Sequence, residues 1–198
     1  MKSLVKKLVR LACREYSIYF LYSQSKADTP HDRRELGPYR VQAVDRETIE
    51  ALPDNVLSRQ AEYCGEGAIA YACFASNRIV ALCFYWHGER YRKRAFWPLS
   101  PAEAKLVQII TLPEERGHGV ARALIAISSN DMLSNNGFDR LYARIWHSNT
   151  PSRKAFKAVG WQLQALVVEM LPWWHRRPLR LQVDLKGSSI KRVRLGAR

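Results

Sequence analysis

The sequence predicts a mixed α/β fold built on one sheet, and three observations support this. Residues 106–112 (LVQIITL) form a short apolar run rich in β-branched residues, which is typical of a buried strand. The apolar residues that follow, from Val120 to Leu133, recur at helical spacing. Two more apolar runs, 68–75 and 79–86, are separated by Ser-Asn-Arg and predict a hairpin. Strands and helices that alternate in this way indicate one sheet with helices packed on it.

The other elements are predicted from caps, breakers and apolar runs. Asp45 is placed to cap a helix over 46–51, Asn136-Gly137 ends a helix over 117–134, and Pro151 begins a helix that Gly160 ends. A further helix is expected over 54–63, after Pro53. The expected strands are 39–44, 68–75, 79–86, 105–112, 141–146, 163–170 and 179–185.

A glycine turn joins the strand at 105–112 to the helix after it. Gly117 and Gly119 allow a positive φ and let a ligand approach the backbone. The first amides of a helix have no partner within it, and the helix dipole adds partial positive charge. Together they predict a site for phosphate or pyrophosphate, with a plain structural turn as the alternative. The third glycine of a dinucleotide fingerprint and the Gly-Lys-Ser/Thr of a Walker loop are missing.

The basic charge of the chain is concentrated at its ends. Residues 1–22 carry five basic side chains and one acid, and residues 175–198 carry eight and one, which gives +11 of the net +14. Residues 2–22 are predicted to form a basic amphipathic helix, with Leu4, Leu8 and Leu11 on its apolar half. Such a helix suits the surface of an anionic membrane. It could instead pack on its own domain or on a second copy, so a homodimer stays open; nucleic acid is the least favoured partner.

Composition excludes several classes of protein. No apolar run reaches the length of a membrane span, and charges interrupt any apolar core of a secretory signal. The four cysteines, Cys13, Cys64, Cys73 and Cys83, show no metal-ligand spacing. They are expected to be buried free thiols in a reducing compartment, so the predicted location is cytoplasmic. The predicted basic helix places the protein at the inner face of the membrane, as a peripheral protein. No metal is predicted.

Two segments resemble the GNAT superfamily of N-acetyltransferases. Arg116–Ala121 (RGHGVA) matches the family's Arg/Gln-x-x-Gly-x-Gly/Ala motif. Residues 149–161 (NTPSRKAFKAVGW) resemble its second signature: an Asn, a small residue, a helix, then Gly-Phe. The resemblance covers roughly residues 38–171. It implies a single mixed, mostly antiparallel sheet flanked by helices, as in acyl-CoA N-acyltransferases. The predicted domains are 1–37, amphipathic helix and linker; 38–185, GNAT-like domain; and 186–198, basic C-terminal tail.

The resemblance also implies acetyl-CoA as co-substrate and a set of residues that hold it. The first motif would hold the pyrophosphate, the central strand would pair with the pantetheine arm, and the second signature would lie near the cofactor. The residues implied are Ile109, Thr111, Arg116, Gly117, His118, Gly119, Val120, Ala121, Asn149 and Ser152.

The chain departs from the family where acid and base are expected. Phe156 stands where many relatives have a Tyr general acid, and Val107 and Gln108 stand near the usual Glu base. Gln108 could hold a water, and His147 is the nearest side chain with a suitable unperturbed pKa. Relatives that lack these groups can act by positioning alone.

The predicted function is transfer of an acetyl group to a primary amine. The expected acceptor is an amino-sugar or another small molecule. It is expected near the membrane, because the predicted N-terminal helix is basic. Two alternatives remain open from the sequence: a protein N-terminus or lysine as acceptor, and a non-catalytic GNAT-like module that binds nucleic acid or membrane.

Overall fold

The computed structural model of the protein describes residues 13–28, 38–53, 56–92, 98–174, 179–185 and 190–194. The chain divides into two compact units. We call residues Ser23–Ala143 with Pro151–Gln162 the turn unit, because it contains Gly117 and Gly119. We call Met1–Tyr22, Arg144–Thr150 and Leu163–Arg198 the basic unit.

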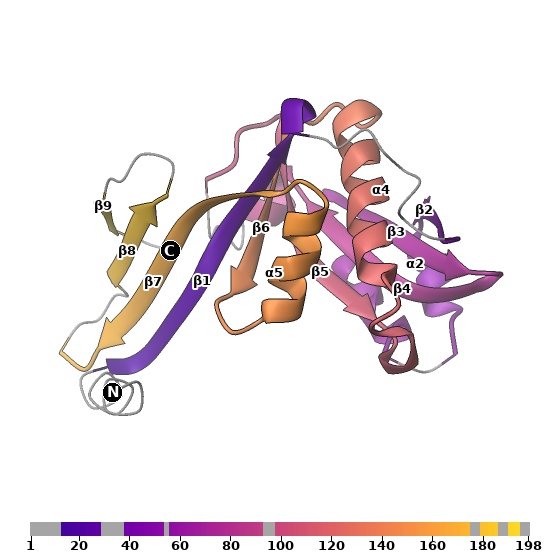
Figure 1. The fold of residues 1–198 in the computed structure, drawn as a ribbon, viewed down its shortest axis with the longest axis horizontal. Helices are drawn as coiled ribbons and strands as arrows, with labels where there is room; N and C mark the ends of the chain where they lie inside the picture. The colour runs from indigo at the N-terminus through magenta and orange to yellow at the C-terminus, as the bar shows by residue number, and fades with distance from the viewer. Residues whose placement is uncertain are drawn as a thin grey trace. The chain divides into compact units, whose positions relative to one another are not determined.

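The strands of the described residues form one mixed sheet in the order β2-β3-β4-β5-β6-β1-β7-β8-β9 (Figure 1). Among the pairs with a defined register, only β5 and β6 run parallel. This confirms the predicted mixed, mostly antiparallel sheet. The strands are β1 (Cys13–Ser25), β2 (Arg40–Val44), β3 (Ala68–Ala75), β4 (Arg78–Trp86), β5 (Glu103–Thr111), β6 (Arg140–Trp146), β7 (Gln162–Pro172), β8 (Leu179–Asp184) and β9 (Ile190–Arg194).

Helices α2, α4 and α5 lie at or near the places that caps and breakers predict, whereas the short helix α3 was not predicted. Asp45 caps α2, because its carboxylate accepts from the Thr48 amide at 2.8 Å. Gly137, with φ of 76°, follows the end of α4. The helices are α2 (Arg46–Glu50), α3 (Gly88–Arg92), α4 (Val120–Ser134) and α5 (Thr150–Ala158), with 3₁₀ turns η1 (Lys26–Asp28), η3 (Ser58–Tyr63) and η4 (Pro113–Glu115).

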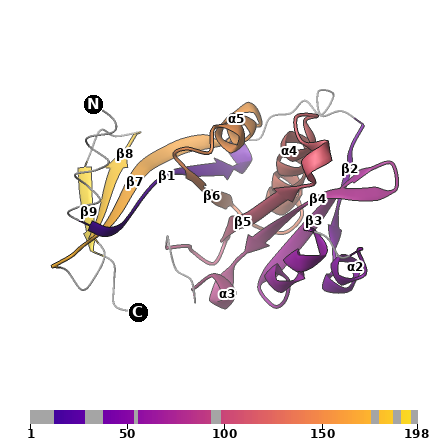
Figure 2. The ribbon, with the colours of Figure 1, turned by 90° about the horizontal axis from the view of Figure 1, so that it is seen from below.

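Strand β4 is buried on both faces at the centre of the turn unit. Alternate side chains of a strand point to opposite faces. Leu82 and Phe84 join a core with Ile49 of α2 and Leu57 beside η3, whereas the Tyr85 hydroxyl meets that of Ser128 on α4 at 3.0 Å. Helix α4 therefore covers one face of the sheet, and α2 with η3 covers the other (Figure 2).

The predicted helix over 2–22 is wrong for the residues described. Cys13–Ser25 form strand β1, which lies between β6 and β7 in the sheet (Figure 1), and residues 1–12 lie outside the described residues. The helical pattern rested on residues 4–12. From Tyr16 to Tyr22 the chain has four aromatic residues and the β-branched Ile18, which favour a strand. Tyr19 and Leu21 are fully buried, so this segment belongs to the core.

Three other expectations are corrected. Part of the predicted linker continues β1: Ser23 and Gln24 are buried, and Gln24 Nε2 donates to the Val159 carbonyl at 3.2 Å. The helix expected over 54–63 is reduced to η3. Within the predicted tail, Ile190–Arg194 form β9, antiparallel to β8. The predicted domain boundaries themselves stay a prediction.

Candidate functional site

Strand β5 carries an irregularity in the middle of its length. Phe84 of β4 pairs with Gln108 and Tyr85 with Leu106, so Val107 is an extra residue that forms a β-bulge. On its other side, β5 pairs with β6 over Glu103–Leu106. Residues 107–111 therefore have no partner in β6, although β4 pairs with 108–111 on the other side and Arg116 Nε donates to the Thr111 carbonyl at 3.4 Å. Unpaired backbone amides and carbonyls need partners, so this segment is prepared to pair with an extended ligand that carries amides.

The glycine turn follows directly after β5 and η4. Gly117 and Gly119 have φ of 87° and 84°, in the left-handed region that favours glycine. Gly119 is the N-cap of α4, and the amide of Ala123 donates to its carbonyl at 3.0 Å. The earlier amides, of Val120 and Ala121, have no carbonyl within the helix to bond. A Cβ built on Gly117 or Gly119 would meet no protein atom within 4 Å, so the turn is open above the backbone.

Side chains from other parts of the turn unit hold this turn. Arg78 forms ion pairs with Glu115 at 2.7 Å and with Glu114 at 3.4 Å. Tyr39 Oη donates to the His118 carbonyl at 3.0 Å. These contacts involve side chains and one carbonyl, so they hold the turn in place and leave the backbone N–H groups at the start of α4 available to a ligand. The result is a rigid N-terminus of a fifteen-residue helix, which is a site for anionic phosphate.

Comparison with protein families agrees with this geometry. Residues 36–161 match the acetyltransferase (GNAT) family. The chain belongs to this family. It is an acetyl-CoA-dependent N-acetyltransferase, with acetyl-CoA as co-substrate. The comparison with curated proteins found no match.

Two solved structures with TM-scores above 0.5 share the fold of this acetyltransferase at low sequence identity, and a third is similar to it at a lower score. A GNAT-family acetyltransferase from Colwellia psychrerythraea has a TM-score of 0.56 and 13% identity, over 84% of this chain and 60% of that chain. A GCN5-related N-acetyltransferase from Kribbella flavida has a TM-score of 0.54 and 14% identity, over 88% of this chain and 65% of that chain. The aminoglycoside acetyltransferase AAC(6')-Iy, with a bisubstrate analogue, has a TM-score of 0.47 and 20% identity, over 63% of this chain and 90% of that chain.

The structure brings most of the predicted cofactor residues of the acetyltransferase into the turn unit. Ile109 and Thr111 lie on the segment of β5 beyond the bulge, and Arg116–Ala121 form the turn and the start of α4. Ser152 also belongs to this unit, whereas Asn149 and His147 belong to the basic unit. Their roles in holding or acetylating a ligand remain predictions.

Gln108 is held by a neighbour that the sequence does not reveal. Its amide nitrogen donates to Gln60 Oε1 at 3.0 Å, and Gln60 Nε2 donates to the Val56 carbonyl at 3.0 Å. This chain of hydrogen bonds ties β5, next to its bulge, to η3. A carboxamide transfers no proton at neutral pH, so Gln108 can orient a water or an amine and cannot act as the base. No spacing in the sequence connects residues 60 and 108.

His147 is held in one orientation by the backbone of Ile18. Its ring Nδ1 lies 3.1 Å from the Ile18 carbonyl, and its backbone amide donates to the same oxygen at 3.0 Å. A carbonyl can only accept, so Nδ1 carries a proton. The two contacts to the Ile18 carbonyl fix the orientation of the exposed ring.

Phe156 has a packing role in place of the family's tyrosine. Its ring is 2% exposed and meets Trp161 edge-on, with ring centroids 4.9 Å apart. Trp161 in turn donates from Nε1 to Ser129 Oγ of α4 at 3.2 Å. A hydroxyl at position 156 is therefore not needed to hold α5 against the unit, and the thiolate must leave without a phenol at this position.

Proposed function

We propose that this acetyltransferase transfers the acetyl group of acetyl-CoA to the primary amine of a small molecule, an amino-sugar or a similar acceptor, on the cytoplasmic side of a membrane. The observation that carries the proposal is the open turn at Gly117 and Gly119, because bare amides at a helix N-terminus suit a diphosphate. The backbone of 107–111 on β5 supports it, because it offers partners to the amides of a pantetheine arm.

The reaction requires few protein groups. The amine nitrogen attacks the thioester carbonyl, the C–N bond forms, the C–S bond breaks, and coenzyme A leaves as its thiol after the amine loses a proton. Positioning of the amine supplies much of the rate. His147 is the candidate for accepting the proton, and Gln108 is the candidate for orienting the amine or a water.

Two glycines at opposite ends of α4 test the binding of the acyl donor. Gly119→Ala places a methyl group where the diphosphate is expected, and Gly137→Ala places one at the other end of the helix. Both have positive φ and open space, so the two variants suffer similar backbone strain. We expect Gly119→Ala to weaken acetyl-CoA binding, measured by calorimetry, at least about tenfold more than Gly137→Ala. Equal affinities in both variants would refute the proposed site.

The choice of acceptor is tested by thiol release. The protein is incubated with acetyl-CoA and either amino-sugars or peptides with free N-termini and lysines, and the coenzyme A formed is measured. Turnover is expected with amino-sugars. Turnover with peptides alone would mean that the acceptor is a protein. If no amine is acetylated while acetyl-CoA still binds, the proposed acceptor is refuted but the proposed acetyl-CoA site is not.

Charge and exposed tryptophans support the membrane part of the proposal. The basic unit contains fourteen Lys and Arg against three acids, a net charge of +11. Trp173 and Trp174, after β7, are 55% and 74% exposed, and tryptophan is favoured at the interface of a bilayer. The four cysteines are free, which suits a reducing compartment such as the cytoplasm. No helix among the described residues is long and apolar enough to cross a bilayer.

Vesicle sedimentation tests this part. We expect binding to vesicles that contain phosphatidylserine, little binding to pure phosphatidylcholine, and a loss of binding as salt rises. Trp174→Ala should weaken binding several-fold, because a large ring leaves the interface. Equal sedimentation with neutral and anionic vesicles would contradict the charge argument, and wild-type binding by Trp174→Ala would contradict the role of the ring.

A further inference from the structure

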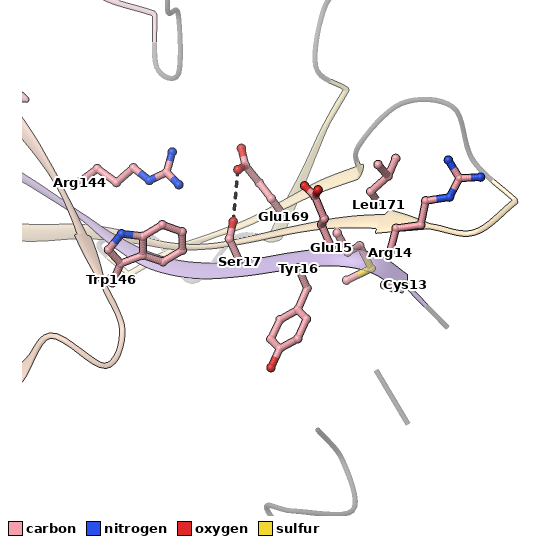
Figure 3. A pocket seen from close by; sticks show the side chains of 10 residues that line it. Cys13, Arg14, Glu15, Tyr16, Ser17, Arg144, Trp146, Glu169 and Leu171 are labelled. Atoms are coloured by element: carbon pink, nitrogen blue, oxygen red, sulfur yellow. Dashed lines mark hydrogen bonds between the residues drawn. The ribbon is translucent and has the colours of Figure 1, made fainter. Parts of the chain in front are cut away.

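Polar groups in the two units differ in how closely they specify a ligand. The basic unit contains a pocket of about 600 Å³, lined by β1, the end of β6 and β7 (Figure 3). Its lining includes Trp146 and charged side chains of both signs, which are Arg14, Glu15, Arg144 and Glu169. Two arginines beside two glutamates do not indicate the charge of a ligand. The turn unit instead contains a pair of carboxamides whose hydrogen bonds have a defined direction.

Gln108 is a polar residue at a position with apolar neighbours. It pairs with Phe84 of β4, and residues that face each other across antiparallel strands lie on the same face of the sheet. Phe84 belongs to the core beside α2 and η3, and Val107 and Ile110 pack against the same core. A half-buried carboxamide among apolar side chains costs free energy unless it forms hydrogen bonds. Gln60 is the partner that the structure supplies.

The Val56 carbonyl fixes the direction of both hydrogen bonds in this chain. A backbone carbonyl only accepts, so the atom of Gln60 that lies 3.0 Å from it is the amide nitrogen. The oxygen of the same carboxamide then faces Gln108 and accepts from Gln108 Nε2 at 3.0 Å. Gln108 is therefore held with its amide nitrogen toward η3, and its oxygen is the end that remains for a ligand.

Gln108 Oε1 is available to a ligand. It has no hydrogen-bond partner among the residues that the structure describes, and it is not one of their fully buried, unpartnered side-chain atoms. Gln108 is the first residue after the bulge, in the stretch 107–111 that has no partner in β6 and that we assign to the pantetheine arm. A free carbonyl oxygen can only accept a hydrogen bond. The group that suits it beside a thioester is an N–H of the attacking amine.

We propose that Gln60 is a positioning residue, which holds Gln108 so that Oε1 accepts a hydrogen bond from the attacking amine. The inference rests on the proposed function, because it requires an amine acceptor. As the C–N bond forms, the nitrogen gains positive charge, and a carbonyl dipole aimed at its N–H stabilises that charge. The hydrogen bond is thus stronger in the transition state than with the neutral amine, so it raises kcat more than it lowers KM. Gln108 takes up no proton. In the opposite orientation, its amide N–H would point at the nitrogen and oppose the same charge.

Steady-state thiol release by the full chain tests this role, with acetyl-CoA and glucosamine, or with a lysine peptide if the chain acetylates only peptides. Every primary amine carries an N–H, so the test does not depend on the class of acceptor. Gln108→Met removes the oxygen and keeps a similar side-chain length. It should lower kcat about tenfold and change the KM for the amine less than about threefold. Gln60→Met leaves the carboxamide of Gln108 free to turn and should lower kcat about fivefold.

A double-mutant cycle separates positioning from a general structural effect. If Gln60 acts through Gln108, adding Gln60→Met to Gln108→Met should cause no further loss of kcat. Gln60→Glu keeps an oxygen that accepts from Gln108 Nε2, so it should lose less activity than Gln60→Met. Gln162→Met is the matched control, because it is the same change at an exposed residue of the same unit, and it should leave kcat and KM unchanged.

Acetyl-CoA affinity, measured by calorimetry, should stay within about twofold of the wild-type value in all these variants, because the glycine turn is unchanged. Wild-type kcat in both Gln60→Met and Gln108→Met would overturn the inference and leave the proposed function standing. An equal loss from Gln60→Met with and without Gln108 would also overturn it. If the wild type acetylates no amine while acetyl-CoA binds, the proposed function fails, and this inference fails with it.

Discussion

The two compact units carry comparable numbers of basic side chains but very different numbers of acids. The turn unit has eighteen Lys and Arg against fifteen Asp and Glu, and the basic unit has fourteen against three. In the turn unit, ion pairs such as Arg78–Glu115 lie at the surface, and the interior holds neutral thiols and phenols. In the basic unit, one of the few acids, Glu169, forms an ion pair with Arg180, and their side chains are only 18% and 7% exposed.

Because of this difference, ion pairs contribute differently to the stability of the two units. A surface pair in a balanced unit is one of many and is screened by water. A mostly buried pair is screened less by water, and removal of its cation leaves the carboxylate without its closest partner. We therefore expect the stability of the basic unit to depend on single charged residues, and that of the turn unit to depend on burial.

The largest expected effect comes from breaking the buried pair. Arg180→Met should lower the free energy of unfolding by about 3 kcal/mol, because it leaves the partly buried Glu169 carboxylate without its closest cation. Arg78→Met is the matched control, since the Arg78–Glu115 pair has nearly the same length, 2.7 Å against 2.6 Å, but Arg78 is 59% exposed. Its loss should cost less than about 1 kcal/mol.

Urea unfolding of both variants measures this contrast, and the double variant Glu169→Gln, Arg180→Met refines it. Because the double variant leaves no unpaired charge, it should recover most of the lost stability. Equal losses of unfolding free energy in Arg180→Met and Arg78→Met would show that the two units do not differ in their dependence on ion pairs.

The same contrast explains how much of the fold could be predicted from the sequence. In the turn unit, apolar periodicity and glycine placement dictate local structure, and β4, α4 and the turn at Gly119 lie where expected. In the basic unit, the apolar spacing of residues 4–12 predicts a helix over 2–22, whereas the aromatic residues from Tyr16 to Tyr22 favour the strand that forms. Local patterns do not encode that β1 is buried between two strands far along the chain.

The candidate site was predictable in part for the same reason. The motif Arg116–Ala121 is contiguous, so its turn geometry follows from its glycines. The contacts Gln108–Gln60 and Arg78–Glu115 join residues distant in sequence, and they arise only from strand register and from the bulge at Val107. The pocket at Glu15 and Trp146 depends on three strands that meet only in the folded sheet.

An intermediate effect is expected from alkaline pH on the turn unit. Burial raises the pKa of the Cys73 thiol from 9.0 to about 12, with a smaller contribution from the charge of Glu115, and burial raises that of Cys83 to about 12. A pKa raised by folding stabilises the native state below pH 9, and this stability is lost as the unfolded thiols ionise. Between about pH 8 and about pH 10 the two thiols should together cost about 2–3 kcal/mol.

Urea unfolding at several pH values checks this loss, and the variant Cys73→Ala, Cys83→Ala is the comparison. It should be less stable at neutral pH, because two buried side chains are shortened, but its stability should change much less over the same pH range. A slope that the double variant leaves unchanged would assign the alkaline loss to other groups.

The smallest expected effect distinguishes charged from neutral hydrogen bonds within the turn unit. Tyr71 Oη donates to Asp131 Oδ2 at 2.6 Å, and Tyr85 Oη meets Ser128 Oγ at 3.0 Å, while the two rings pack edge-on. Burial, and then the hydrogen bond to Asp131, raises the pKa of Tyr71 above its usual range. Tyr71→Phe should cost about 1–2 kcal/mol and Tyr85→Phe about 1 kcal/mol, because a bond to a carboxylate is the stronger one. Asp131 keeps the side-chain amide of Asn136 as a donor at 3.1 Å, which limits the loss in Tyr71→Phe.

Urea unfolding of the two variants measures the difference in unfolding free energy. A larger loss in Tyr85→Phe would mean that burial of the phenol outweighs the charge of its partner.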